Sequence, residues 1–228
     1  MLTTNITTHL PAESIFPTYW SLADLQNHLG VPAERIRAFP QPGTATEADV
    51  ERIESSEGRL YELNNGVLVE KTIGWYESLI AAYIARLIGN FLDTHDLGQV
   101  LGADGTLKLM PGIVRIPDVS FISWSRFPET KLPRCPIPLL IPDLAVEVLS
   151  EGNTKTELDA KLLKYFEAGV RMVWYVDPLT RTAILYEGID LIQPIGCAGD
   201  LHGGDVLPGF RVSLKAVFDH ADRQRPVA

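Results

Sequence analysis

The chain has 228 residues, of which 46% are hydrophobic and 21% charged, a composition typical of a packed soluble domain with extensions. No apolar run reaches the ~20 residues that cross a bilayer, and the N-terminus lacks the basic and apolar regions of a secretory signal. We therefore expect a cytoplasmic protein without membrane contact. The formal net charge of −9 counts against strong non-specific binding of nucleic acid, which usually relies on a basic surface.

The residues that most often bind transition metals are not clustered. Cys135 and Cys197 lie far apart and match no metal-binding spacing, so we interpret them as reduced thiols. The five histidines are scattered along the sequence. Any metal ion would therefore be held by carboxylates, which favour hard ions such as Mg²⁺ or Mn²⁺.

Residues 1–58 are predicted to form a helical extension. One helix is expected at 21–29, with Ser21 as its N-cap, and a polar helix at 47–56, with Thr46 as its N-cap. A proline-rich connector separates the two helices.

Residues 59–142 mix strand and helix patterns. The segment RLYELNNGVLVEK predicts a β-hairpin that turns at its Asn-Asn-Gly sequence. The apolar spacing from 75 to about 94 predicts a long amphipathic helix. Residues 98–110 predict a strand or a hairpin, and 116–123 predict a strand that a proline introduces. A proline-rich loop, 127–142, follows.

Residues 144–176 predict a strand–helix–strand unit, with strands at 144–149 and 172–176 and a helix at 154–168 closed by Gly169. Such a crossover requires a parallel pair of strands, almost always right-handed. Residues after 182 predict short strands and turns. We therefore expect an α/β (α+β) fold with a mixed β-sheet flanked by helices and an added hairpin. Its main domain would span 59–220, followed by a tail at 221–228.

Two acidic residues stand inside strands that otherwise look buried. Alternation places Asp118 on one face of its strand, opposite Val119 and Phe121. Glu147 is flanked by valines in mid-strand, where an unpaired carboxylate would be costly. A buried ion pair with an arginine is one explanation for Glu147. The presence of Asp118 favours a second explanation, a metal site. Two carboxylates on neighbouring strands repel each other unless a cation, such as a divalent metal ion, lies between them.

The helix at 154–168 supplies a candidate cation. With 100° per residue, Lys161 lies at the edge of the apolar stripe, whereas Lys164 points away. Lys161 could reach towards the preceding strand, or it could be a lysine whose stem covers the core while its amine reaches water. Glu157 follows Thr154 at the spacing of a capping box, so we interpret Glu157 as a helix cap.

Two further acids have open interpretations. Glu77 lies in the first turn of the helix at 75–94, where an acid either complements the helix dipole or acts as a third carboxylate at a metal ion. Asp143 forms a second Pro-Asp pair with Pro142. It is expected at the edge of its strand, and we rank it below Asp118.

The order and spacing of several segments resemble the bacterial Uma-two family of putative restriction endonucleases, which have the PD-(D/E)XK nuclease fold. The resemblance covers about Arg59 to Phe218. The segments that carry it are RLYELNNGVLVEK, GADGTLKL, VRIPDVSFISW, LAVEVLSEGNTKTELDAKLLKYFEAGVRMVWYVDP and DVLPGF.

The resemblance implies roles for individual residues. Asp118 matches the aspartate of the PD motif and Glu147 the acid of the following strand, both metal ligands. The superfamily's usual lysine position, two residues after that acid, is Leu149 here. The family instead has a lysine on the next helix, four residues before a tyrosine, which Lys161 and Tyr165 match. Glu77 lies where many superfamily members have an additional acid, although this family often has a histidine there.

The resulting hypothesis is hydrolysis of DNA phosphodiester bonds. Asp118 and Glu147, with Glu77 as a third acid, would hold Mg²⁺ or Mn²⁺, and Lys161 would orient the attacking water or offset charge. A rival hypothesis is a catalytically weak or inactive nuclease-fold module that binds nucleic acid or a protein. A homodimer formed through the extension and the proline-rich loop is also expected.

Overall fold

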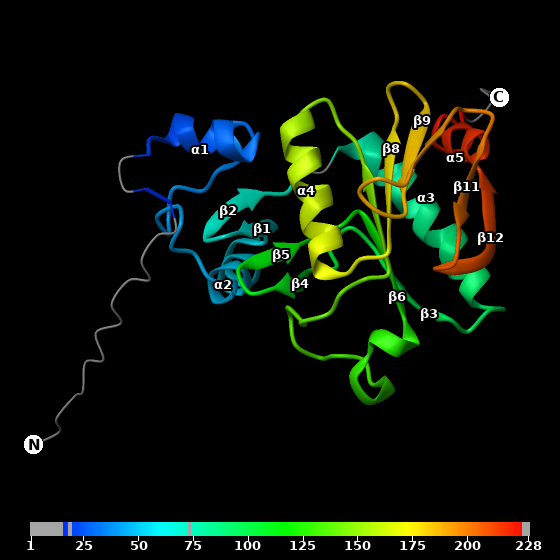
Figure 1. Cartoon of the computed structure of the whole chain (residues 1–228), viewed down its shortest axis with the longest axis horizontal. Helices are drawn as coiled ribbons and strands as arrows, with labels where there is room; N and C mark the ends of the chain where they lie inside the picture. Colours follow the sequence, from blue (N-terminus) through cyan, green and yellow to red (C-terminus); the bar gives the residue numbers. More distant parts are fainter. Residues whose placement is uncertain (1–15, 18–19, 73, 225–228) are drawn as a thin grey trace, which may run out of the picture.

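The computed structural model describes residues 16–17, 20–72 and 74–224. The start of the predicted extension, 1–15, and the end of the predicted tail, 225–228, lie outside the described residues. Helices α1 and α2 lie at one end of the long axis of the molecule with strands β1 and β2, whereas α5, β11 and β12 lie at the other end (Figure 1).

A six-stranded mixed sheet forms the centre of the fold, in the order β10-β9-β8-β7-β6-β3. Strands β7 and β8 are parallel, and every other neighbouring pair is antiparallel. The predicted mixed sheet is therefore confirmed. The strands are β3 (Gly98–Leu101), β6 (Val119–Ser123), β7 (Leu144–Val148), β8 (Met172–Asp177), β9 (Thr182–Tyr186) and β10 (Ile192–Ile195).

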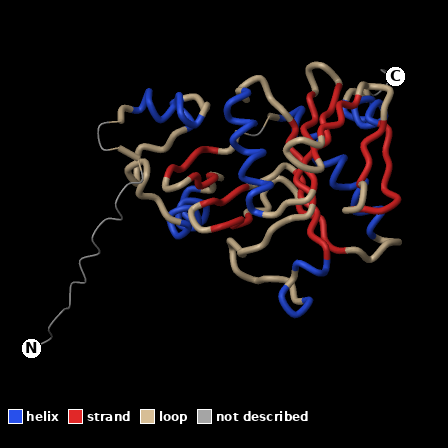
Figure 2. The backbone as a smooth tube through the Cα atoms, in the orientation of Figure 1, coloured by secondary structure: helices blue, strands red, loops and turns tan. Residues whose placement is uncertain are grey.

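Helices cover both faces of this sheet, as the red strands and blue helices of Figure 2 show. Helix α3 (Trp75–Leu92) and helix α5 (Leu214–Ala221) pack on one face, where the largest apolar cluster lies. Helix α4 (Lys155–Ala168) packs on the other face with a second cluster. The alternation predicted for strand β7 holds, because Leu144, Val146 and Val148 face α3 while Ala145 faces α4. Both faces are buried, as expected for the centre of a layered α/β fold.

The predicted β7–α4–β8 crossover is confirmed, with its strands paired in parallel. The Thr154 hydroxyl accepts a hydrogen bond from the Glu157 N–H and caps α4. Gly169 ends the helix at a φ of 96°, a backbone conformation that favours glycine.

A second, four-stranded antiparallel sheet has the order β2-β1-β5-β4. Its strands are β1 (Tyr61–Asn64), β2 (Val67–Glu70), β4 (Leu107–Met110) and β5 (Ile113–Arg115). The predicted hairpin is β1–β2, turning at Asn65 and Gly66, which both have positive φ. The hairpin alternative for residues 98–110 is wrong, because β3 and β4 belong to different sheets. Strand β5 was not predicted.

Both predicted N-terminal helices form, as α1 (Leu22–Leu29) and α2 (Glu47–Glu57). Ser21 and Thr46 begin them in capping boxes with Asp24 and Asp49. Helix α1 packs on the β2 strand and α2 on the face of β1.

The C-terminal part combines a two-stranded sheet of β11 (Asp200–Gly203) and β12 (Leu207–Ser213) with α5. The prediction of strands and turns alone is wrong here, because residues 214–221 form a helix that packs against α3. None of the described helices is long and apolar enough to span a bilayer.

Candidate active site

The two sheets meet at the connection from β5 to β6, which carries Ile116, Pro117 and Asp118. Asp118 lies one residue before β6 rather than inside it, and its N–H donates to the Val146 carbonyl of β7 at 3.0 Å. Its Oδ2 accepts the Val148 N–H at 2.7 Å. Two backbone contacts with β7 therefore fix the aspartate beside the strand that carries Glu147.

Glu147 projects from β7 towards α4. Its Oε1 accepts a hydrogen bond from the Tyr165 hydroxyl at 2.5 Å and lies 2.9 Å from Lys161 Nζ. The side chain of Glu147 is 9% exposed and that of Lys161 13%. The buried ion pair that the sequence suggested as one explanation is present, but its cation is Lys161 rather than an arginine.

A third acid, Glu62 on β1, shares the same lysine. Its Oε1 lies 3.0 Å from Lys161 Nζ and accepts the Ile116 N–H, also at 3.0 Å. Lys71, directly after β2, pairs with Asp118 at 2.8 Å and donates to the Ile116 carbonyl. The four-stranded sheet thus contributes an acid and a lysine that sequence reasoning missed.

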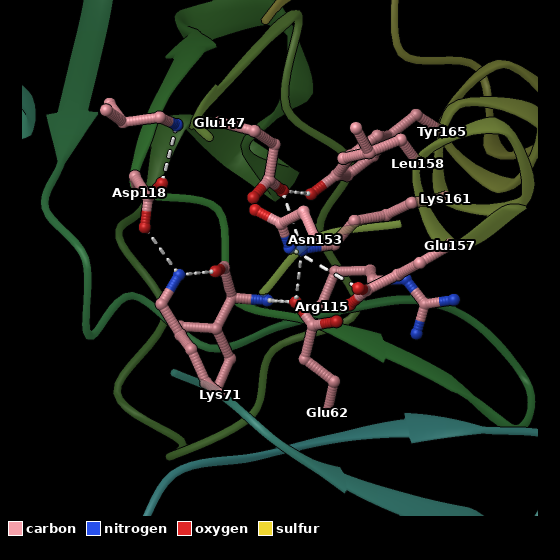
Figure 3. Close-up of polar contacts among 12 residues, drawn as sticks. Glu62, Lys71, Arg115, Asp118, Glu147, Asn153, Glu157, Leu158, Lys161 and Tyr165 are labelled. Carbon is pink, nitrogen blue, oxygen red and sulfur yellow. Dashed lines mark hydrogen bonds and ion pairs between the residues drawn. The ribbon is translucent and has the colours of Figure 1, made fainter. Parts of the chain in front are cut away.

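These contacts link three acids and two lysines in one network (Figure 3). The network runs from Asp118 through Lys71 and the Ile116 backbone to Glu62, then through Lys161 to Glu147. The backbone N–H of Val148, the residue after Glu147, donates to Asp118. Each carboxylate therefore meets a positive group, which offsets the cost of removing its charge from water.

Burial and neighbouring charges shift the pKa values of the two glutamates and of Lys161. Burial opposes the ionisation of Glu62, but Lys161, Arg115 and Lys71 outweigh it and lower the pKa of Glu62 to about 2. Burial raises the pKa of Glu147, and the nearby Asp118 and Glu62 carboxylates add to this effect against the attraction of the lysines. Burial also disfavours the charged form of Lys161, yet Glu147 and Glu62 raise its pKa above the ordinary value. Lys161 is therefore cationic at neutral pH.

A cleft opens over this network of acids and lysines. Among the described residues that line it are five carboxylates and three cationic side chains, a formal excess of two negative charges. That excess matches one divalent cation, and carboxylate oxygens are the donors that Mg²⁺ and Mn²⁺ prefer. Within the described ranges, no three His, Cys, Asp or Glu side chains already converge on one point. The residues fit an ion held by two carboxylates together with water, since Mg²⁺ is often bound by only one or two carboxylates and keeps several waters. The lining charges are Arg35, Glu62, Lys71, Glu77, Asp118, Glu147, Glu157 and Lys161.

The remaining predicted acids lie in three different settings. Glu77 lines the cleft from the first turn of α3 and makes no hydrogen bond or ion pair within the described part of the chain, so both of its interpretations stay open. Glu157 is not the second half of a capping box, because its carboxylate binds Arg35. Asp143 is 2% exposed outside the cleft, where it pairs with Arg126 and accepts the Ser123 N–H.

Glu62 carries the same sequence signal as Glu147, an acid between apolar residues in mid-strand, and Tyr61 and Leu63 are indeed buried. Lys71 has no such signal, since it follows a strand and is brought to Asp118 only by tertiary structure. The superfamily's usual lysine position, Leu149, donates its N–H to the Val176 carbonyl and packs beside the α4 cluster.

Comparison with known proteins identifies the family of this chain. The family model "Uma2: Putative restriction endonuclease" matches residues 48–215. The crystal structure of a putative nuclease of DUF820 from Anabaena variabilis ATCC 29413 superposes with a TM-score of 0.63 at 19% identity. The superposition covers 71% of this chain and 91% of that one. No curated protein matches the sequence. The chain belongs to the Uma2 family, with a nuclease-like fold, as its segments predicted.

Proposed function

We propose that this protein is a metal-dependent endonuclease that hydrolyses phosphodiester bonds of DNA, with Asp118, Glu147 and Lys161 as its catalytic residues. One observation carries the proposal. These three side chains, from two strands' ends and a helix, face one cleft whose lining has the charge of a site for a divalent cation. The likeness of the fold to that of a putative nuclease also supports the proposal.

Each residue has a distinct task in this proposal. Asp118 and Glu147 would hold Mg²⁺ or Mn²⁺, with Glu77, which also lines the cleft, as a third carboxylate. The bound ion lowers the pKa of the attacking water and polarises the scissile phosphate. Lys161 Nζ, kept charged by Glu147 and Glu62, orients that water or stabilises negative charge on the phosphate. Tyr165 holds the Glu147 carboxylate by donating to its Oε1.

The oxygens available for an ion also follow from the contacts. Glu147 uses Oε1 for Lys161 and Tyr165, and no described residue donates to its Oε2. Asp118 uses Oδ1 for Lys71 and Oδ2 for a backbone N–H. Glu147 therefore offers an oxygen without a partner among the described residues, whereas at Asp118 the Lys71 charge competes with the ion.

Cleavage assays test the proposal. Purified protein with Mg²⁺ or Mn²⁺ is incubated with single-stranded, duplex and branched DNA, beside the variants Asp118→Asn, Glu147→Gln and Lys161→Met. Lys164→Met is the matched control, because Lys164 lies on the same helix but pairs with Glu167 away from the cleft. Cleavage by the wild type and the control alone is expected. Intact DNA in every reaction would contradict the enzymatic proposal.

A second candidate, a nuclease-fold module without activity, is favoured by the lysines that already neutralise Asp118 and Glu147. Calorimetry separates the two. A metal-dependent enzyme binds Mn²⁺ and loses it in Glu147→Ala, whereas an inactive interaction module binds none. The expected homodimer stays a prediction, which light scattering tests.

A further inference from the structure

The N-terminal segment, the part of the chain before residue 48, packs against a strand of the candidate site. Leu25, Leu29, Val31 and Ile36 form a buried cluster with Val67 and Val69 of β2, the strand that leads to Lys71. The family model begins only at residue 48. A part of the chain outside the matched region thus lies against one of the strands that build the cleft.

The same segment also contacts the N-terminus of α4. The Thr154 hydroxyl, which caps the helix, donates to the Gly30 carbonyl. Gly30 has a φ of +68°, and a Cβ there would lie 2.6 Å from Thr156 Cβ and 2.7 Å from the Glu157 N atom. Only glycine fits this approach, so the contact between α1 and α4 is closely packed.

Arg35 makes the strongest contact across this junction. Its Nη1 and Nη2 bind the two oxygens of Glu157 at 3.0 and 2.9 Å, and its Nε donates to the Glu70 carbonyl at 3.0 Å. The two side chains are 11% and 10% exposed. A two-pronged, largely buried pair fixes both distance and orientation more firmly than a surface ion pair. Arg35 therefore joins β2 to the first turn of α4.

Glu157, Lys161 and Tyr165 follow one another at intervals of four residues and form one stripe of α4. Arg35 holds the first member, Glu62 and Glu147 hold the second, and Glu147 holds the third. Because β7 fixes Glu147, the position of α4 decides whether Lys161 Nζ reaches it.

We infer that Arg35 is a positioning residue: through Glu157 it holds α4 where Lys161 meets Glu147, so the N-terminal segment is a working part of the cleft. The contact itself is independent of the chemistry, and only its catalytic meaning rests on the proposed function.

Acetylation of lysine amines, followed by mass spectrometry, tests this inference without DNA or metal. In the wild type, Lys161 and Lys71 react slowly, because their side chains are 13% and 6% exposed and ion-paired. Arg35→Met is expected to accelerate acetylation of Lys161 about tenfold, since removing one partner of a buried pair leaves the other charge uncompensated and loosens the helix. Lys71, held by Asp118, is expected to stay protected.

Two further variants keep the result specific. Arg37→Met is the matched control, because Arg37 lies in the same segment but forms its two-pronged pair with Glu57 of α2 rather than with α4. Glu157→Gln should act in the same direction as Arg35→Met, and the double variant should equal Arg35→Met, since both single variants remove the same ion pair. Glu157→Gln removes the ion pair without altering the N-terminal segment, so the test stays valid if Arg35→Met folds poorly.

The outcomes divide cleanly. Faster acetylation of Lys161 alone, in Arg35→Met and Glu157→Gln but not in Arg37→Met, supports the inference. Unchanged Lys161, or equal acceleration of Lys71, overturns it. If the wild type cleaves DNA, Arg35→Met should lower kcat while KM stays near its original value. If it does not, the proposed function fails while the acetylation result still decides the role of Arg35.

Discussion

Replacing Glu62 with glutamine removes the carboxylate that Lys161 shares with Glu147. Burial works against this charge, yet Lys161, Arg115 and Lys71 lower the pKa of Glu62 from an ordinary 4.5 to about 2. At about 1.4 kcal/mol for each tenfold change in an ionisation equilibrium, the folded state gains about 3 kcal/mol from the ionised carboxylate. Glu62→Gln is therefore expected to lower the free energy of unfolding by up to about 3 kcal/mol at pH 7.

The pH dependence of this loss has a defined sign. A carboxyl whose pKa is lowered in the folded state stabilises the protein above its unfolded pKa. That stability is lost as the pH falls through the folded pKa. The gap between the wild type and Glu62→Gln should thus be constant above pH 5 and should shrink from about pH 4.5 towards pH 2. Urea unfolding of both proteins at pH 7, 5, 4 and 3.5 measures it.

Glu167→Gln is the matched control, because Glu167 pairs with Lys164 on the surface of α4. Such a pair contributes less than about 0.5 kcal/mol. A loss in Glu62→Gln of equal size at pH 7 and 3.5 would show that shape rather than charge causes it. A variant as stable as the wild type at pH 7 would refute the electrostatic account.

Three other expectations follow from the same contacts. In calorimetry, Lys71→Met should bind Mn²⁺ about tenfold more tightly than the wild type, because it frees Asp118 from a competing cation. Lys71→Arg keeps that cation and should not bind more tightly. Equal affinities of Lys71→Met and the wild type would contradict this competition. Tyr165→Phe should cost about 2 kcal/mol in urea unfolding, since it removes a buried donor to the Glu147 carboxylate, and an unchanged midpoint would argue that the bond contributes nothing. Gly66→Ala should lower stability by at least about 2 kcal/mol, because the residue has a φ of +81° and its Cβ would lie 2.5 Å from neighbouring backbone. Gly58→Ala, with similar φ and open space, should cost less.

The sequence allowed prediction of the features that depend on local periodicity. An acid between two valines had to be buried and paired, and Glu147 is. Helix phase placed Lys161 at the edge of the apolar stripe, from which it could reach the preceding strand, and Lys164 away from it. The ion pairs show that Lys161 does reach Glu147. The family's lysine position, four residues before Tyr165, agreed with that phase.

Features that depend on long-range pairing escaped prediction. A strand pattern does not specify its partner, so residues 98–110 were predicted as a strand or a hairpin, although they divide between two sheets. Asp118 pairs with Lys71, and Glu157 pairs with Arg35. Both partners are distant in sequence, and no local pattern indicates either pair. Helix α5 differs, because Leu214, Val217 and Phe218 follow helical spacing and are buried, so its pattern was present in the sequence.

Under the proposed function, the formal excess of two negative charges in the cleft would couple the binding of the metal ion to the binding of nucleic acid. The cleft without an ion would repel a phosphodiester, and the acidic chain as a whole would add to that repulsion. An ion with two positive charges would cancel the excess and so would raise the affinity for nucleic acid. By linkage, nucleic acid would raise the affinity for the ion by the same factor. Such a cleft would stay empty when only one of the two is present at low concentration, and it would fill cooperatively when both are.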